Sequence, residues 1–258
     1  RAAVDEVSPL LVVSVRWFFV SILLTFLCRK ELFETWKVLK YRLKWLVIMG
    51  LFGFTSFNSF YYIAAHDTIA INLGLVQGTM PAFIIIISRI WLKEKINIPQ
   101  LIGVIITFVA VLLVVSSGNL YALMKLQLNK GDIVMIFACT LYAVYAVGLR
   151  KKPKIGALVL LTFFSYVAFI GSLPGLFYET FTSNLVFPGM KGIIILSVII
   201  IFPSFLAQIF FMKGVEKIGP ARSGLYTNLV PVFASILAVL LLGELFKLYH
   251  LILSLIHI

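Results

Sequence analysis

The sequence IAINLGLVQGTMPAFIIIISRIWLKE, residues 69–94, decides the fold, because its pattern returns 150 positions later as GPARSGLYTNLVPVFASILAVLLLGE, residues 219–244. The identical residues at this offset include Phe60 and Phe210, Gly74 and Gly224, Leu75 and Leu225, Pro81 and Pro231, Phe83 and Phe233, and Glu94 and Glu244. Self-similarity at one fixed offset indicates a repeated structural unit. We therefore expect the two halves of the chain to fold alike.

Each of the two stretches is an apolar run of more than 20 residues with a proline about half way along. At about 1.5 Å per residue, such a run can cross a hydrocarbon layer of roughly 30 Å as a helix. Proline donates no backbone hydrogen bond and collides with the carbonyl four residues earlier, so Pro81 and Pro231 are predicted to break their helices and to free the carbonyls of Gln77 and Thr227. Freed backbone at membrane depth is tolerated only where protein or an aqueous cavity receives it. The prolines therefore suggest a transport path.

The composition excludes a soluble globular protein. Hydrophobic residues make up 62% of the chain and charged residues only 12%, and the mean hydropathy is +1.09. A soluble surface needs more polar cover than this. The net charge of +12 comes without a basic stripe interleaved with stacking aromatics outside the apolar runs, so we expect a lipid bilayer and a small molecule as partners and no nucleic acid.

Eight apolar segments are long enough to cross a membrane. They are predicted at residues 9–27, 43–65, 69–92, 98–115, 132–148, 155–178, 191–212 and 219–242, with a ninth that starts at 245 and ends too early to cross. The basic segment 28–44 between the first two spans is predicted as a loop. Both cysteines, Cys28 and Cys139, lie in apolar stretches, and we expect two free thiols.

The repeat advances by five spans, because the second span matches the seventh and the third matches the eighth. Five is an odd number, so equivalent helices must cross the bilayer in opposite directions, as in many secondary transporters. We therefore predict an all-α membrane protein with a ten-helix inverted-repeat (5+5) transporter fold, of which this sequence lacks the first helix and the end of the last. The two repeats are predicted at 1–116 and 131–258.

The loops predict the orientation. Alternate loops place 15 of the 22 basic residues on one side of the membrane. By the positive-inside rule, that side is cytoplasmic. We expect an integral, multi-pass protein, in a bacterial inner or plasma membrane, with both termini of the full protein in the cytoplasm.

The repeated block with its proline and closing glutamate, together with the opening SPLLVVSVRW that sets Pro9 seven residues before Arg16, resembles the EamA branch of the drug/metabolite transporter superfamily. The resemblance covers nearly the whole chain. It implies a ten-helix transporter of two inverted five-helix repeats, and members commonly export amino acids and other small metabolites. One departure from the repeat is Lys93, where the second copy has Gly243.

Arg16 is the sharpest candidate for substrate contact. Insertion of an arginine at the centre of a membrane helix costs about 2.5 to 3.5 kcal/mol. One reading is that its guanidinium holds a substrate carboxylate in two parallel bonds. The alternative is that Arg16 bonds helix-end carbonyls or extends along its stem to the membrane surface.

Further polar residues lie near the predicted helix breaks or at equivalent positions of the two repeats, and an inverted repeat places its central site at this depth. The predicted substrate-binding residues are Arg16, Asn58, Gln77, Gln208, Tyr226, Thr227 and Asn228, with helix breaks at Pro81 and Pro231. Ordinary hydrogen bonding between helices is the competing interpretation for each of the polar residues except Arg16. Asn72 is expected to anchor at the membrane interface.

Other sites and functions are less well supported by the sequence. Glu94 and Glu244 are expected to cap the following helices, and the three histidines lack metal-ligand spacing. We therefore expect no catalytic residues, no metal, no cofactor and no enzyme activity. All ten acidic residues fall in loops or at span ends, which favours facilitated export or exchange over proton coupling. A nucleotide-sugar or phosphorylated-sugar antiporter, and a non-transporting membrane scaffold, are the alternatives, and a homodimer is compatible with the sequence.

Overall fold

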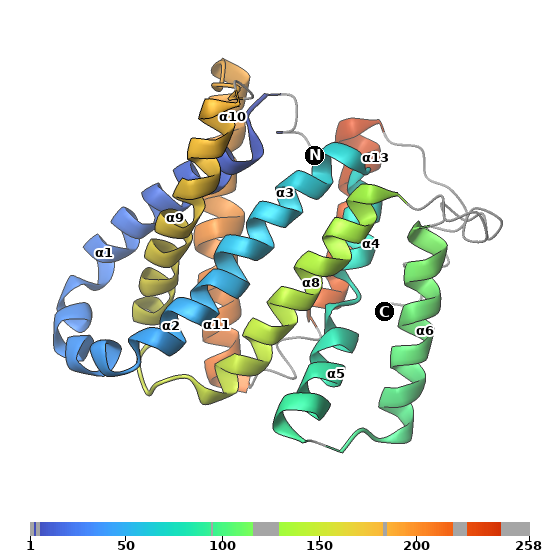
Figure 1. Cartoon of the computed structure of the whole chain (residues 1–258), viewed down its shortest axis with the longest axis horizontal. Coiled ribbons are helices and arrows are strands. Elements are labelled where there is room, and N and C mark those ends of the chain that lie inside the picture. The colour runs from blue at the N-terminus through green and yellow to red at the C-terminus, as the bar shows by residue number, and fades with distance from the viewer. Residues whose placement is uncertain are drawn as a thin grey trace. The chain divides into compact units, whose positions relative to one another are not determined.

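The computed structural model describes residues 3, 6–93, 95–115, 129–182, 185–218 and 226–243, and within these ranges the chain is helical and contains no strand (Figure 1). Six segments of this part are long and apolar enough to cross a bilayer: Pro9–Tyr41, Leu43–Asp67, Ala70–Leu92, Lys130–Lys151, Ala157–Phe181 and Met190–Gly214. The prediction of an all-α, multi-pass membrane protein is confirmed for these residues. The start of the eighth predicted span and the whole of the ninth lie outside them.

The chain divides into two compact units. The first, called here the α1 unit, contains Ala2–Ser59 and Gly148–Ser223, and the second, the α4 unit, contains Phe60–Val147 and Gly224–Ile258 together with Arg1. The repeats predicted at 1–116 and 131–258 are each continuous in sequence. The compact units are not, because each combines helices from the first and the second half of the chain.

The α1 unit is built on the helices α1 (Pro9–Tyr41) and α9 (Ala157–Phe181). These helices pack antiparallel: successive residues along α1 contact residues of α9 with decreasing numbers. Ser14 Oγ lies 2.7 Å from Ser172 Oγ, the rings of Phe18 and Phe169 are 5.2 Å apart, and Cys28 Sγ lies 3.1 Å from Thr162 Oγ1. The core of the unit lies along this helix pair.

Gly171 and Gly175 of α9 permit a close approach of neighbouring chain. A Cβ atom at Gly171 would lie 2.8 Å from Thr55 Oγ1, and one at Gly175 would lie 2.5 Å from a methyl carbon of Leu10. Small residues four apart commonly form such helix contacts in membranes. These two glycines therefore allow close packing of α9 against neighbouring parts of the α1 unit.

The segment after residue 28 is helical, not the predicted loop. Helix α1 bends where Cys28 leaves helical geometry, with φ −120° and ψ 24°, and then continues to Tyr41 (Figure 1). Leucine, glutamate and lysine, which favour helices, dominate the continuation. Leu39 is fully buried, so one face of this segment packs on the protein while its charges stay outside.

Two π-helical segments lie at equivalent positions of the repeat. The segment η1 (Leu51–Ser56) separates α2 (Leu43–Gly50) from α3 (Phe57–Asp67), and η3 (Ile200–Leu206) separates α10 (Met190–Ile199) from α11 (Ala207–Ile218). Both π segments lie in the α1 unit, and α3 passes into the α4 unit after Ser59.

Pro203 explains the second π segment in part. It cannot donate to the carbonyl of Ile199, and the Ser204 hydroxyl donates to that carbonyl instead at 2.7 Å. Single π-helical turns inside α-helices are rare and occur frequently at functional sites.

The α4 unit contains α4 (Ala70–Gln77), α5 (Met80–Leu92), α6 (Ile98–Val115) and α8 (Lys130–Gly148), with η4 (Tyr226–Leu229) and α13 (Val230–Leu242) from the second repeat. The 3₁₀ turn η2 (Leu149–Lys151) follows α8 in the chain and belongs to the α1 unit.

The helix restarts at the proline in both repeats, since Pro81 is the second residue of α5 and Pro231 the second residue of α13. Beside the first break, the carbonyl of Val76 accepts hydrogen bonds from Thr79 Oγ1 at 2.6 Å and from Cys139 Sγ at 3.7 Å.

Both helices that follow the prolines end in the same backbone conformation. In the described part of the chain, positive φ angles occur at Lys93, with 57°, and Gly243, with 66°. Their amide groups donate to the carbonyls of Ser88 and Ala238, five residues earlier in each case. The departure from the repeat at Lys93 therefore changes the residue and keeps the left-handed turn, at a steric cost that glycine avoids.

Candidate substrate-binding site

Arg16 and Asn58 come together in the α1 unit, on helices α1 and α3. Arg16 Nη1 donates a hydrogen bond to Asn58 Oδ1 at 3.1 Å, and Asn58 Nδ2 donates to the carbonyl of Phe54 at 2.6 Å. Their side chains are 5% and 8% exposed. Because the amide nitrogen of Asn58 is held by the backbone of η1, its oxygen is turned toward the guanidinium.

Aromatic rings surround this pair. The guanidinium carbon of Arg16 lies 4.8 Å from the centre of the Trp17 ring, a cation–π distance. The Trp17 ring contacts Phe54 edge to face at 5.1 Å, and Phe54 lies 5.2 Å from Phe164. Trp17 and Phe164 are completely buried. A cation in such surroundings interacts more strongly with an anion than it would in water.

The remaining predicted site residues occupy both units. Gln208 is half-buried in α11, in the α1 unit, whereas Gln77 is half-buried at the end of α4 and Tyr226 is 67% exposed in η4, both in the α4 unit. The side chains of Thr227 and Asn228 lie outside the described residues. The hydrogen bond between Arg16 and Asn58 thus joins two of the seven, and a common cavity for all of them remains a prediction.

A second polar cluster, absent from the sequence prediction, surrounds Asp132 in the α4 unit. Asp132 is completely buried near the start of α8, and its carboxylate accepts hydrogen bonds from Thr68 Oγ1 at 2.5 Å and from Asn72 Nδ2 at 3.2 Å. Asn72 is only 3% exposed, so it is a buried partner of this carboxylate and not an interfacial anchor. The cluster ties the turn between α3 and α4 to the start of α8.

A local signal for this cluster was present in the sequence. Asn129 precedes the span, and its Oδ1 accepts from the backbone amides of Gly131 at 2.8 Å and Asp132 at 3.4 Å. Asparagine is a favoured residue at helix starts for this reason. The sequence placed Asp132 correctly at a span end, but the burial of its side chain depends on α3 and α4.

Glu179 performs a related task in the α1 unit. It lies in the last turn of α9, and its Oε1 accepts from the amide of Leu10 at 3.1 Å, at the start of α1. A carboxylate there satisfies a free amide and complements the positive end of the helix dipole. Glu179 therefore holds the antiparallel pair α1 and α9 in register.

Within the described residues, no group of three or more histidine, cysteine, aspartate or glutamate side chains is placed to hold a metal ion. Cys28 and Cys139 are both free and buried. The guanidinium of Arg16 and the amide of Asn58 together are suited to binding an anion.

Comparisons with known proteins agree with the fold. A family model described as the EamA-like transporter family matches residues 1–116 and 129–258. The uncharacterized transporter YyaM of Bacillus subtilis is 28% identical over 74% of this chain and 63% of its own length. The uncharacterized transporter YetK of the same organism is 26% identical over 80% of this chain and 62% of its own length.

A more distant relative covers more of the chain. An uncharacterized transporter of Archaeoglobus fulgidus is 23% identical over 95% of this chain and 84% of its own length. One crystal structure is similar with a TM-score of 0.64 and 18% identity, over 99% of this chain and 88% of the other. This chain spans less than two thirds of each of the two Bacillus relatives. Since the family model matches nearly all of its residues, the chain belongs to the EamA-like transporter family.

Proposed function

We propose that this protein is a carrier that exports amino acids or related small metabolites by alternating access, and that Arg16 holds an anionic group of the substrate. The observation that carries the proposal is the buried guanidinium of Arg16, oriented by Asn58 inside two candidate membrane spans. Ionisable groups within membrane helices are costly and most often mark a substrate or ion pathway.

The contacts suggest how the site would bind. A carboxylate fits the planar edge of a guanidinium in two parallel hydrogen bonds. Asn58 and the Trp17 ring fix the orientation of that edge before the substrate arrives. A preoriented cation loses less conformational freedom on binding, which favours affinity.

An inverted 5+5 repeat would provide the moving parts. The antiparallel packing of α1 on α9 supports it, because the repeat pairs the first predicted span with the sixth and requires them to run in opposite directions. The π segments η1 and η3 support it as well, because they interrupt the second and seventh spans at equivalent positions. Such interruptions are places where a helix can change its bend.

The orientation and the mode of energy coupling belong to the same proposal. We place the side that is rich in lysine and arginine in the cytoplasm, by the positive-inside rule. We infer facilitated export or exchange, because the buried carboxylates of Asp132 and Glu179 bond helix ends and turns. In reconstituted vesicles, export that is unaffected by collapse of a proton gradient is expected.

The test is metabolite profiling of the medium from cells that express the full-length protein. We expect amino acids or other small carboxylates to accumulate with the wild type, to fall to background with Arg16→Ala and to be retained with Arg89→Ala. Arg89 is an exposed arginine in α5, and it controls for the loss of one positive charge. Both variants must reach the membrane in equal amounts. Undiminished export by Arg16→Ala, or accumulation of uncharged sugars or nucleotide sugars alone, would reject the proposal.

A further inference from the structure

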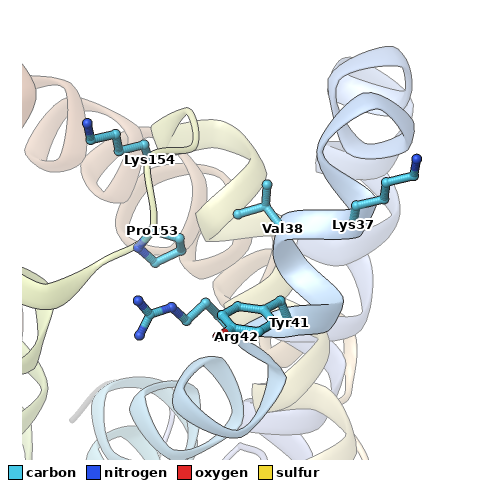
Figure 2. Close-up of a pocket in the computed structure, with 6 residues that line it drawn as sticks. All are labelled: Lys37, Val38, Tyr41, Arg42, Pro153 and Lys154. Atoms are coloured by element: carbon cyan, nitrogen blue, oxygen red, sulfur yellow. The ribbon is translucent and has the colours of Figure 1, made fainter.

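A pocket outside the candidate substrate site lies in the α1 unit, where the end of α1 meets the segment before α9. It has a volume of about 410 Å³ and is lined by Lys37, Val38, Tyr41, Arg42, Pro153 and Lys154 (Figure 2). Small-molecule sites typically occupy roughly 300 to 1,000 Å³. The pocket is therefore large enough for a polar headgroup.

The lining combines cations with apolar surface. Three of its six residues are lysine or arginine and none is acidic. In Figure 2 the Arg42 side chain extends beneath Pro153, while Lys37 and Lys154 lie at opposite sides of the pocket. The guanidinium carbon of Arg42 is 5.9 Å from the Tyr41 ring centre, which restricts its position. An arginine flanked by lysines is well suited to a phosphate group.

The surroundings of the pocket match a membrane surface. After the bend at Cys28, the last part of α1 presents Phe33, Trp36 and Tyr41, whose side chains are 87%, 57% and 85% exposed. Aromatic side chains beside lysine and arginine are typical of helices that lie in the headgroup layer. The apolar part of α1 runs from Pro9 to the bend at Cys28, and the charged segment begins at the next residue, Arg29. A membrane lipid is thus the phosphate source nearest to the pocket.

We propose that the pocket formed by Lys37, Tyr41, Arg42, Pro153 and Lys154 binds the phosphate of an anionic phospholipid headgroup. Arg42 contacts the phosphate, and the ammonium groups of Lys37 and Lys154 swing toward it from the rim. Val38, Tyr41 and Pro153 pack against the glycerol portion. The bound lipid bridges the end of α1 and the segment before α9, which are more than 100 residues apart in the sequence. This site is separate from Arg16 and does not depend on the transported substrate.

The experiment titrates phosphatidylglycerol into the full-length protein in a neutral detergent and follows lipid-bound species by native mass spectrometry. Phosphatidylcholine, which is zwitterionic, serves as the lipid control, and glycerol phosphate and inorganic phosphate serve as soluble anions. Each cation near an anionic membrane surface contributes measurably to lipid binding, so we expect the double substitution Arg42→Gln with Lys154→Gln to weaken phosphatidylglycerol binding roughly tenfold or more.

The matched control is Lys93→Gln with Lys95→Gln, which removes two exposed positive charges elsewhere. This control is expected to bind phosphatidylglycerol as the wild type does. The conservative variant Arg42→Lys is expected to retain part of the affinity, and retained binding would also show that this segment still folds. Equal loss in both double variants would show a general charge effect and overturn the proposal. Wild-type binding by Arg42→Gln with Lys154→Gln would overturn it too. Glycerol phosphate that binds as tightly as phosphatidylglycerol would identify a site for soluble anions instead.

Discussion

The hydrogen bond between Arg16 and Asn58 makes a quantitative prediction about stability. Hydrogen bonds between membrane helices contribute about 0.6 kcal/mol on average and about 1.7 kcal/mol at most. The bond from Arg16 Nη1 to Asn58 Oδ1 is 3.1 Å long, buried and charge-assisted. Such bonds lie at the strong end of the range, so we expect a coupling free energy of about 1.5 kcal/mol.

A double-mutant cycle with Arg16→Met and Asn58→Leu isolates this coupling. Asn58→Leu alone is expected to lower the free energy of unfolding by about 2 kcal/mol, because it also removes the 2.6 Å bond from Asn58 Nδ2 to the carbonyl of Phe54. The free energy of unfolding would be measured for the full-length protein in bicelles by steric trapping. The cycle cancels the separate effect of removing a buried charge at Arg16.

The control cycle uses Ser14 and Ser172, whose hydroxyl oxygens lie 2.7 Å apart in the same unit. This pair is neutral, so a coupling near the membrane average of about 0.6 kcal/mol is expected. If the Arg16–Asn58 coupling is no larger than that of the serine pair, Asn58 does not hold the guanidinium, and the argument for a preoriented cation fails.

Two further predictions concern the backbone and the packing. Lys93→Gly is expected to raise the free energy of unfolding by about 1 kcal/mol, because glycine adopts the left-handed conformation at φ 57° without a Cβ clash, while Gly243→Ala is expected to lower it by a similar amount. Thermal unfolding of the two variants measures both, and a destabilised Lys93→Gly would contradict the steric argument. Gly171→Ala is expected to lower the free energy of unfolding by about 1 to 3 kcal/mol, since its Cβ would lie 2.8 Å from Thr55 Oγ1. Gly103→Ala, whose Cβ meets nothing within 4 Å, is the matched control, and equal effects at the two positions would count against the packing reasoning.

The sequence alone determined the helices and most of their ends. Helix α6 (Ile98–Val115) has the predicted bounds, and α5 and α13 begin one residue before Pro81 and Pro231. These features were readable because a backbone hydrogen bond joins residues only four apart, so apolar length and the missing donor of proline act locally. The repeat was readable for the same reason, since equal sequences impose equal local geometry.

The tertiary structure decided which polar groups meet. Arg16 is 42 positions from Asn58, and Asp132 is 60 positions from Asn72 and 64 from Thr68. A side chain's partner across such a separation is set by the register in which helices pack, and this register depends on many weak contacts that no single segment contains. The burial of Asp132 and the basic pocket at Arg42 therefore emerged only when the helices were assembled.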